Sequence, residues 1–194
     1  VQAVDPDTNE QWEVVALDGH FKGHLDGICT NILEAPTTKH LLECKTHNSR
    51  SFGQLLKCRA AGSGVAMSHP EHAAQMQIYM HLAGLTRAFY LAKNKDTDEL
   101  YAERGRYDPV VGMALLAKAD RVRTANQAPV KISDDPDSRA CNRYGSSCPS
   151  APICHYGDWA LRNCRTCLQS SPAPDGEWWC ARHSRVLTIQ DQRG

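Results

Sequence analysis

Asp26, Glu43 and Lys45 form a set of charged residues whose spacing suits metal chemistry. Asp26 follows one short apolar run, and Glu43 and Lys45 follow two leucines in the next. Both segments are typical of β-strands, in which side chains alternate, so Glu43 and Lys45 point to one face. If the strands pair, Asp26 lies beside them. Two neighbouring carboxylates favour Mg²⁺ or Mn²⁺, with the backbone carbonyl of Cys44 as a further oxygen ligand. With a lysine to hold a metal-bound water, the set predicts hydrolysis of a phosphodiester.

A helix is expected further along the chain, beginning at Ser68 and ending at Gly84. Ser68 is predicted to be the N-cap, with Glu71 as its partner in a capping box, and Gly84 is a natural stop. Gln75 and Tyr79 are four residues apart and share one face of this helix. The pair is either part of the site or simply the solvated face of an amphipathic helix, and Gln75 is favoured as functional.

Together these residues resemble the PD-(D/E)XK nuclease superfamily. Gln75-x-x-x-Tyr79 is similar to the additional motif of its RecB-like branch, which includes the CRISPR adaptation nucleases and phage exonucleases. The resemblance covers about residues 11–125. It implies an α/β fold with a restriction-endonuclease-like core, in which helices flank a mixed central sheet. It also implies that Asp26, Glu43 and Lys45 are catalytic, with Gln75 and Tyr79 contacting DNA or orienting the metal ligands.

The function implied is a Mg²⁺- or Mn²⁺-dependent deoxyribonuclease, in particular an exonuclease of phage DNA recombination, replication or repair. Its partner would be DNA with single-stranded character or a free end, and its location the cytoplasm of the host. The family places a helix before the first strand; here a strand is expected almost at once, so that helix is expected to be absent. The alternative is a catalytically silent nucleic-acid-binding adaptor that uses a zinc module for recognition.

Further strands are expected around the metal site. Residues 12–17 and 20–25 form a predicted hairpin with an Asp-Gly turn. Residues 39–46, 87–94 and 99–104 are predicted strands, and a helix is expected from Asp108 onward. The stretch from Thr46 to Gly64, which includes His47, is either an ordinary polar loop or a set of phosphate contacts.

Composition separates the chain into a core of residues 1–128, a linker of residues 129–139 and a module of residues 140–194. The module holds six of the nine cysteines. The formal net charge is zero, with 22 basic and 22 acidic residues, which argues against a surface coated by nucleic acid but not against a local groove. No run approaches the length of a membrane span, so no membrane partner is expected.

The cysteine-rich module is predicted to bind metal. Cys164 and Cys167 form a CxxC pair, and Cys180 and His183 form a CxxH pair. Three thiolates and one imidazole suit tetrahedral Zn²⁺, so a structural zinc site is expected here.

A second group, Cys141, Cys148 and Cys154, is less regular. It is similar to the late cysteine run that holds a [4Fe–4S] cluster in RecB-like nucleases, but that run has a cysteine where Gly145 stands here, and its N-terminal cysteine has no counterpart. The group therefore fits either an iron–sulfur cluster or, with His155, a second zinc.

Overall fold

The computed structural model describes residues 1–138, 140–142 and 148–193, and the position of Gly145 lies outside them. The chain divides into two compact units, Val1–Arg121 and Val122–Gly194. Each is described by itself. Within the described residues, none of the helices combines the length and apolar character needed to cross a bilayer.

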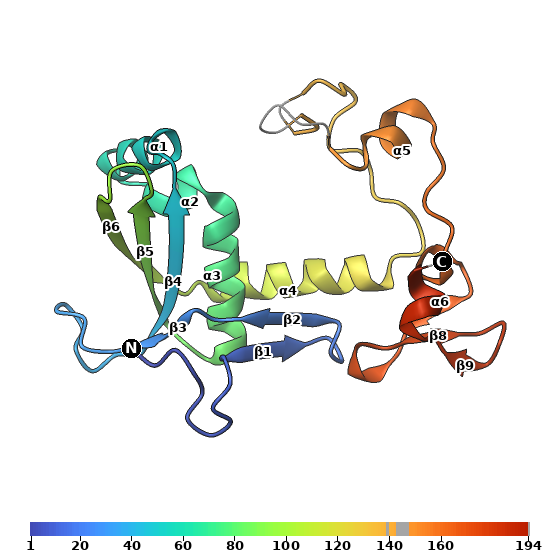
Figure 1. Cartoon of the computed structure of the whole chain (residues 1–194), viewed down its shortest axis with the longest axis horizontal. Coiled ribbons are helices and arrows are strands. Elements are labelled where there is room, and N and C mark those ends of the chain that lie inside the picture. The colour runs from blue at the N-terminus through green and yellow to red at the C-terminus, as the bar shows by residue number, and fades with distance from the viewer. Residues whose placement is uncertain (139, 143–147, 194) are drawn as a thin grey trace. The chain divides into compact units, whose positions relative to one another are not determined.

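A four-stranded mixed sheet forms the centre of the first unit (Figure 1). Its strands, in spatial order, are β3 (Gly27–Cys29), β4 (His40–His47), β5 (Arg87–Asn94) and β6 (Leu100–Arg106). β4 and β5 run parallel, and the two outer pairs are antiparallel. The chain is thus a mixed α/β protein whose central sheet is flanked by helices, as expected. The predicted strand 87–94 coincides with β5, because alternate residues of that strand are buried.

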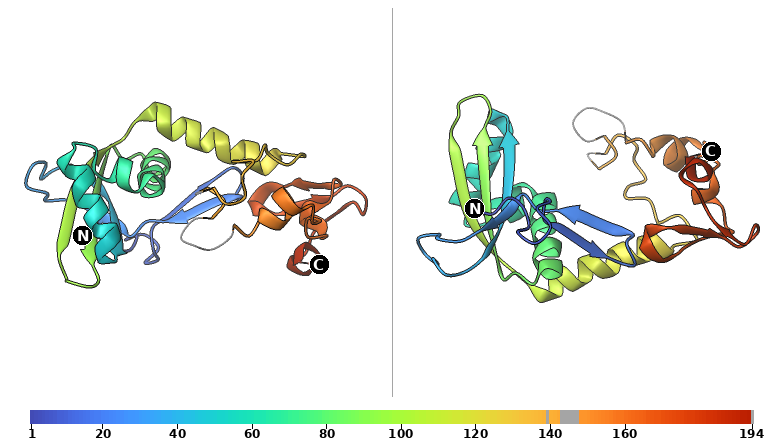
Figure 2. Two further views of the ribbon diagram at one scale, coloured as in Figure 1. Left: turned by 90° about the horizontal axis from the view of Figure 1, so that it is seen from above. Right: turned by 60° about the horizontal axis from the view of Figure 1, so that its bottom comes forward.

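The predicted hairpin forms a small sheet of its own. β1 (Glu13–Ala16) pairs antiparallel with β2 (Phe21–His24). It lies beside α3 (Pro70–Ala83) rather than in the four-stranded sheet, as Figures 1 and 2 show.

Three helices connect β4 to β5. α1 (Ser49–Ala60) and α2 (Gly64–Ser68) form where the sequence suggests either a polar loop or a set of phosphate contacts, and α3 follows. The side chain of Asn48 caps α1 by accepting from the Ser51 amide at 2.9 Å. Residues Phe52, Leu55 and Cys58 of α1 are buried. Because β4 and β5 are parallel, such a helical crossover is what the connection requires.

The capping box predicted for α3 is wrong. His69 precedes α3 without a side-chain cap, and Ser68 instead ends α2, where its hydroxyl donates to the carbonyl of Gly64 at 2.9 Å. The predicted stop is correct, because Gly84 closes the helix in the left-handed conformation that glycine adopts without strain.

The hydrophobic core lies between the sheet and helices α1 and α3. Its fully buried side chains include Leu41 on β4, Leu55 on α1, Met80 on α3 and Tyr90 on β5. These residues fix β4, which carries Glu43 and Lys45, against the helices.

Beyond β6, α4 (Pro109–Thr124) begins at the expected proline. The second unit contains α5 (Ala151–Tyr156), α6 (Ile189–Arg193), and a three-stranded antiparallel sheet of β7 (Ser170–Pro172), β8 (Trp178–Cys180) and β9 (Arg185–Val186). Two single-turn 3₁₀ helices, Cys164–Thr166 and Pro174–Gly176, lie beside these strands in sequence.

Candidate active site

Asp26 lies opposite Glu43, as the pairing of the two strands predicts. β3 and β4 pair with Gly27 opposite Leu42, and Asp26 immediately precedes Gly27. The Cys44 amide donates to Asp26 Oδ2 at 2.7 Å, which holds the carboxylate against β4. Because the N–H and C=O of one strand residue point to the same side, the Cys44 carbonyl also faces the side of Asp26.

Glu43 is fully buried, at 0% exposure, on the face of β4 that also carries Lys45. Its Oε1 faces the Lys45 ammonium in an ion pair, and neither oxygen accepts a hydrogen bond from any other described group. Burial raises the pKa of Glu43, whereas the Lys45 ammonium opposes that rise. The Lys45 side chain remains a quarter exposed, so its ammonium can reach solvent.

This arrangement fits a hard divalent cation. Asp26 and Glu43 lie opposite each other on paired segments, and the Cys44 carbonyl faces the side of Asp26. A buried carboxylate that has a single ammonium as its partner keeps unsatisfied lone pairs, and a metal cation would satisfy them.

The two residues of the α3 motif occupy different surroundings. Tyr79 packs against the backbone of β2, where a Cβ added to Gly23 would lie 2.4 Å from the Tyr79 hydroxyl. Gln75, one turn earlier, is partly buried. Gln77, by contrast, has a structural role: its amide donates to the Arg106 carbonyl at 2.7 Å and accepts from the Asp108 amide at 2.8 Å.

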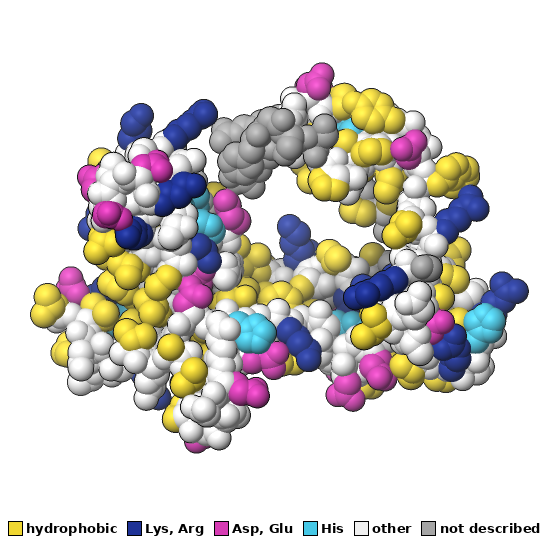
Figure 3. All heavy atoms as spheres, in the orientation of Figure 1, with side chains coloured by type: hydrophobic (Ala, Val, Ile, Leu, Met, Phe, Trp, Pro, Cys, Tyr) yellow, Lys and Arg dark blue, Asp and Glu magenta, His cyan; other side chains and the backbone are white. Residues whose placement is uncertain are grey.

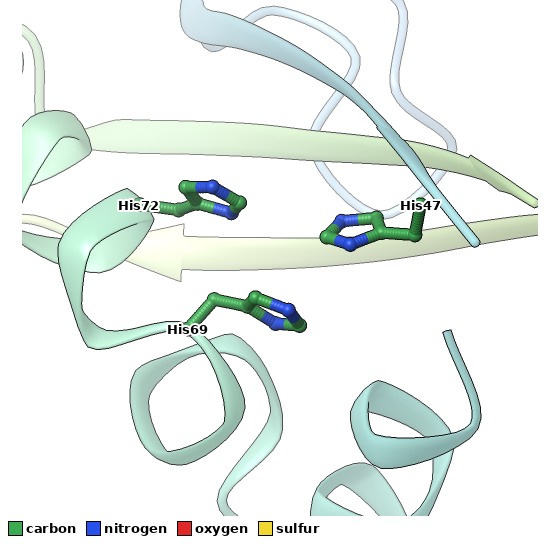
Figure 4. Close-up of side chains that lie close together, drawn as sticks. All are labelled: His47, His69 and His72. Carbon is green, nitrogen blue, oxygen red and sulfur yellow. The ribbon is translucent and has the colours of Figure 1, made fainter. Parts of the chain in front are cut away.

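A cluster of three histidines, His47, His69 and His72, was not foreseen from the sequence. His47 ends β4, His69 joins α2 to α3, and His72 lies in the first turn of α3, so three segments supply one ring each (Figure 4). One potential ligand atom from each ring lies within 4.8 Å of the others. His47 is therefore turned into the protein and is 6% exposed, which does not suit the phosphate contact considered for it.

Burial favours the neutral form of two of these rings, His47 and His72. Desolvation lowers the pKa of His47, and it lowers the pKa of His72 to about 4, with Lys45 contributing to both shifts. The hydroxyl of Tyr90 contacts both rings and its pKa is raised, again chiefly by burial.

Basic and acidic side chains lie together at the end of the first unit that holds α1 and the turn between β5 and β6 (Figure 3). α1 carries three exposed cations and no acidic residue (Arg50, Lys57 and Arg59). The turn instead carries Asp96, Asp98 and Glu99 beside Lys93 and Lys95, and Lys93 is paired with Asp98. Because α1 directly follows β4, its cations lie just beyond the end of the strand that carries Glu43 and Lys45.

The four residues of the predicted zinc site in the second unit differ in their burial. Cys180 is buried, Cys164 is half-buried, and Cys167 and His183 are exposed. Within the described part of the chain, the three-histidine cluster is the only group whose ligand atoms meet the 4.8 Å spacing, so the structure does not gather these four residues into a site. Their zinc site stays a prediction.

The group of Cys141, Cys148 and Cys154 is also not gathered into a metal site among the described residues. The thiol of Cys141 lies 3.5 Å from His155 Nε2, and the Cys148 amide donates to the Cys141 carbonyl at 2.7 Å. Cys154 lies on α5 and is half-buried. Neither the iron–sulfur nor the second zinc interpretation is tested by these contacts.

Comparison with models of known protein families finds no match, and comparison with curated proteins finds none either. Among solved structures, the chain is similar to one described as "Crystal structure of SSO0001", with 18% sequence identity and a TM-score of 0.37. The likeness covers 59% of this chain and spans half the length of that chain.

Proposed function

We propose that this protein is a Mg²⁺- or Mn²⁺-dependent deoxyribonuclease with a restriction-endonuclease-like core, of the RecB-like branch of the PD-(D/E)XK superfamily. One observation carries the proposal. The Asp26 carboxylate is bonded to the backbone of β4 opposite Glu43, whose buried carboxylate has only the Lys45 ammonium as a partner among the described residues.

Each of these residues has a role in phosphodiester hydrolysis. Asp26, Glu43 and the Cys44 carbonyl would hold the metal, which when bound polarises the phosphate and acidifies a water molecule. Lys45 lies against Glu43 and reaches solvent, so it can orient the attacking water and offset the negative charge that develops on the phosphate.

DNA is the proposed substrate because the three exposed cations of α1 follow directly from the end of β4. They could neutralise phosphates of a strand that passes Lys45. A free end is the proposed point of entry, as in an exonuclease.

Cleavage of labelled DNA tests the assignment. Linear end-labelled and covalently circular DNA are incubated with the protein and Mg²⁺ or Mn²⁺, and with chelator as the blank. Glu43→Gln and Asp26→Asn should each lower the rate by at least about a hundredfold, since each removes a charged ligand of the metal. Glu10→Gln is the matched control, because Glu10 is an exposed carboxylate outside the site. Full activity in a folded Glu43→Gln protein would contradict the proposal.

The same assay distinguishes the mode of cleavage. Degradation of linear but not circular DNA would support the exonuclease mode, and equal attack on both would exclude it.

Gln75 and Gln77 form a second matched pair on α3. Gln75→Ala should lower turnover while changing the free energy of unfolding by less than about 0.5 kcal/mol, as for most substitutions of partly exposed polar residues. Gln77→Ala should instead destabilise by about 1–2 kcal/mol, because it removes two hydrogen bonds to backbone groups. Circular dichroism and initial cleavage rates separate the two effects. If Gln75→Ala loses stability and keeps its specific activity, Gln75 has only a structural role.

A further inference from the structure

The three-histidine cluster joins segments that are distant in sequence. His47 lies 22 residues before His69, yet their ring centroids are 4.5 Å apart. The rings of His69 and His72 stack at 5.1 Å. His47 and His69 are buried and His72 is partly buried, so all three imidazoles are largely withdrawn from water.

Two hydroxyl groups already hold the ring nitrogens together in pairs. Ser51 Oγ lies 2.9 Å from His47 Nδ1 and 2.8 Å from His69 Nε2. The Tyr90 hydroxyl lies 2.9 Å from His47 Nε2 and 3.0 Å from His72 Nδ1. His47 thus shares one hydroxyl group with each of the other two rings, so the ring nitrogens converge in pairs on two neighbouring points. A metal ion bound to all three rings would replace at least one of these hydrogen bonds.

We infer that His47, His69 and His72 bind one divalent transition-metal ion, with Zn²⁺ the best match. Three neutral imidazoles are nitrogen ligands of the kind that Zn²⁺ prefers, and they leave a fourth position for a water or for the Tyr90 hydroxyl. This site does not depend on the proposed nuclease function.

The spacing is close to what coordination requires. Zinc–nitrogen bonds of about 2.0–2.1 Å in a tetrahedron place ligand nitrogens about 3.3 Å apart. The observed limit of 4.8 Å then has to shrink by at most about 1.5 Å, which small rotations of the rings provide. On binding, one nitrogen of His47 turns to the metal, and the hydroxyl on its other nitrogen keeps the ring oriented.

The site is distinct from the carboxylate site on the same strand. His47 is four residues beyond Glu43, and a strand rises about 3.3 Å per residue, so their Cα atoms are about 13 Å apart. Metal ions that share one reaction lie about 3.5–4 Å apart. The ligand chemistry differs too, with nitrogen donors at one site and oxygen donors at the other. The histidine site would instead fasten the end of β4 to the start of α3, the helix that carries Gln75.

Metal content of the full chain tests the inference. Protein is loaded with Zn²⁺, freed of excess and assayed for zinc per chain. His72→Gln and His47→Gln should each contain one zinc fewer than the wild type. His81→Gln should match the wild type, because His81 is on the same helix but binds the Tyr107 hydroxyl instead. Tyr90→Phe should also keep its zinc, because it retains all three imidazoles.

Two further measurements distinguish loss of the histidine site from misfolding of a variant, and from zinc bound by the cysteine-rich module. In the unmodified chain, zinc should shift the imidazole ¹⁵N resonances of three of the nine histidines, beyond any change from the module. Those shifts should persist in Cys180→Ser, and cobalt substitution in that variant should show histidine-type absorption without a thiolate charge-transfer band. Unchanged ring resonances, or equal zinc content in wild type and His72→Gln, would overturn the inference.

Discussion

Replacing the two members of the Glu43–Lys45 pair should have unequal effects on stability. In chelator, Lys45→Met leaves a fully buried carboxylate without its cation. Breaking a buried pair in this way costs about 3–5 kcal/mol, and the partial exposure of Lys45 reduces that to about 2–3 kcal/mol. Glu43→Gln leaves a lysine whose ammonium can turn to water, so its effect should stay within about 1 kcal/mol.

The measurement is hydrogen exchange of backbone amides in β4 and β5, because these strands report the first unit alone. Lys93→Met is the control: Lys93 pairs with Asp98, but both side chains are at least half exposed, so its loss should cost no more than about 0.5 kcal/mol. A chain of two units need not unfold in one step, which makes a single global midpoint a poor readout.

Adding Mg²⁺ or Mn²⁺ sharpens the test. Lys45→Met keeps both carboxylates, so the metal at a hundred times its dissociation constant should restore about 2.7 kcal/mol. Glu43→Gln has lost a ligand and should gain much less. Equal destabilisation by the two substitutions in chelator, or equal rescue by metal, would refute this account of the site.

Three other outcomes are expected. In chelator, the free energy of unfolding of the first unit should fall by up to about 2 kcal/mol as the pH drops from 6.5 toward 4. The reason is that the unfolded chain binds a proton on His72 in this range, whereas folded His72, whose pKa is lowered to about 4, does not. Exchange-derived stabilities of His72→Gln should show a smaller slope, with the remainder due to His47, whose pKa is also lowered. Gly64→Ala should cost about 1–3 kcal/mol, since its Cβ would lie 2.1 Å from Glu103 Oε2 at a φ of 48°. Gly53→Ala, with open space around it in α1, should gain about 0.5–1 kcal/mol in the same exchange measurement. Chelation or Cys180→Ser should remove one zinc from the second unit and release the β7–β9 amides to exchange; protection that persists would count against a zinc-dependent fold there.

The sheet and the carboxylate pair could be predicted because their signals are local. Strand β5 alternates buried and exposed residues, and Gly84 marks the end of α3 by its own conformational freedom. Asp26 falls opposite Glu43 because antiparallel pairing fixes the register once both strands are identified.

The helix α1, the role of Ser68 and the histidine cluster depend on tertiary contacts that the local sequence pattern does not indicate. The buried residues of α1 are three apart, and its exposed positions include Arg50, Lys57 and Arg59, so the segment has too few apolar residues for its pattern to indicate a helix. Ser68 has the residue type of an N-cap, but it lies at the end of α2 and bonds backward to Gly64. The histidine cluster forms because the helical crossover between β4 and β5 places His69 and His72 beside His47. No local sequence motif predicts this contact.

The shortness of β3 has a consequence for self-association. Beyond Leu42, no described strand pairs with the β3 side of β4, and Asp26 covers that edge by accepting from the Cys44 amide. An open strand edge is a template for pairing with another chain. Asp26 thus shields this strand edge from pairing with a second chain. Asp26→Ala should therefore self-associate at concentrations where Asp26→Asn, whose amide oxygen can still accept that hydrogen bond, does not.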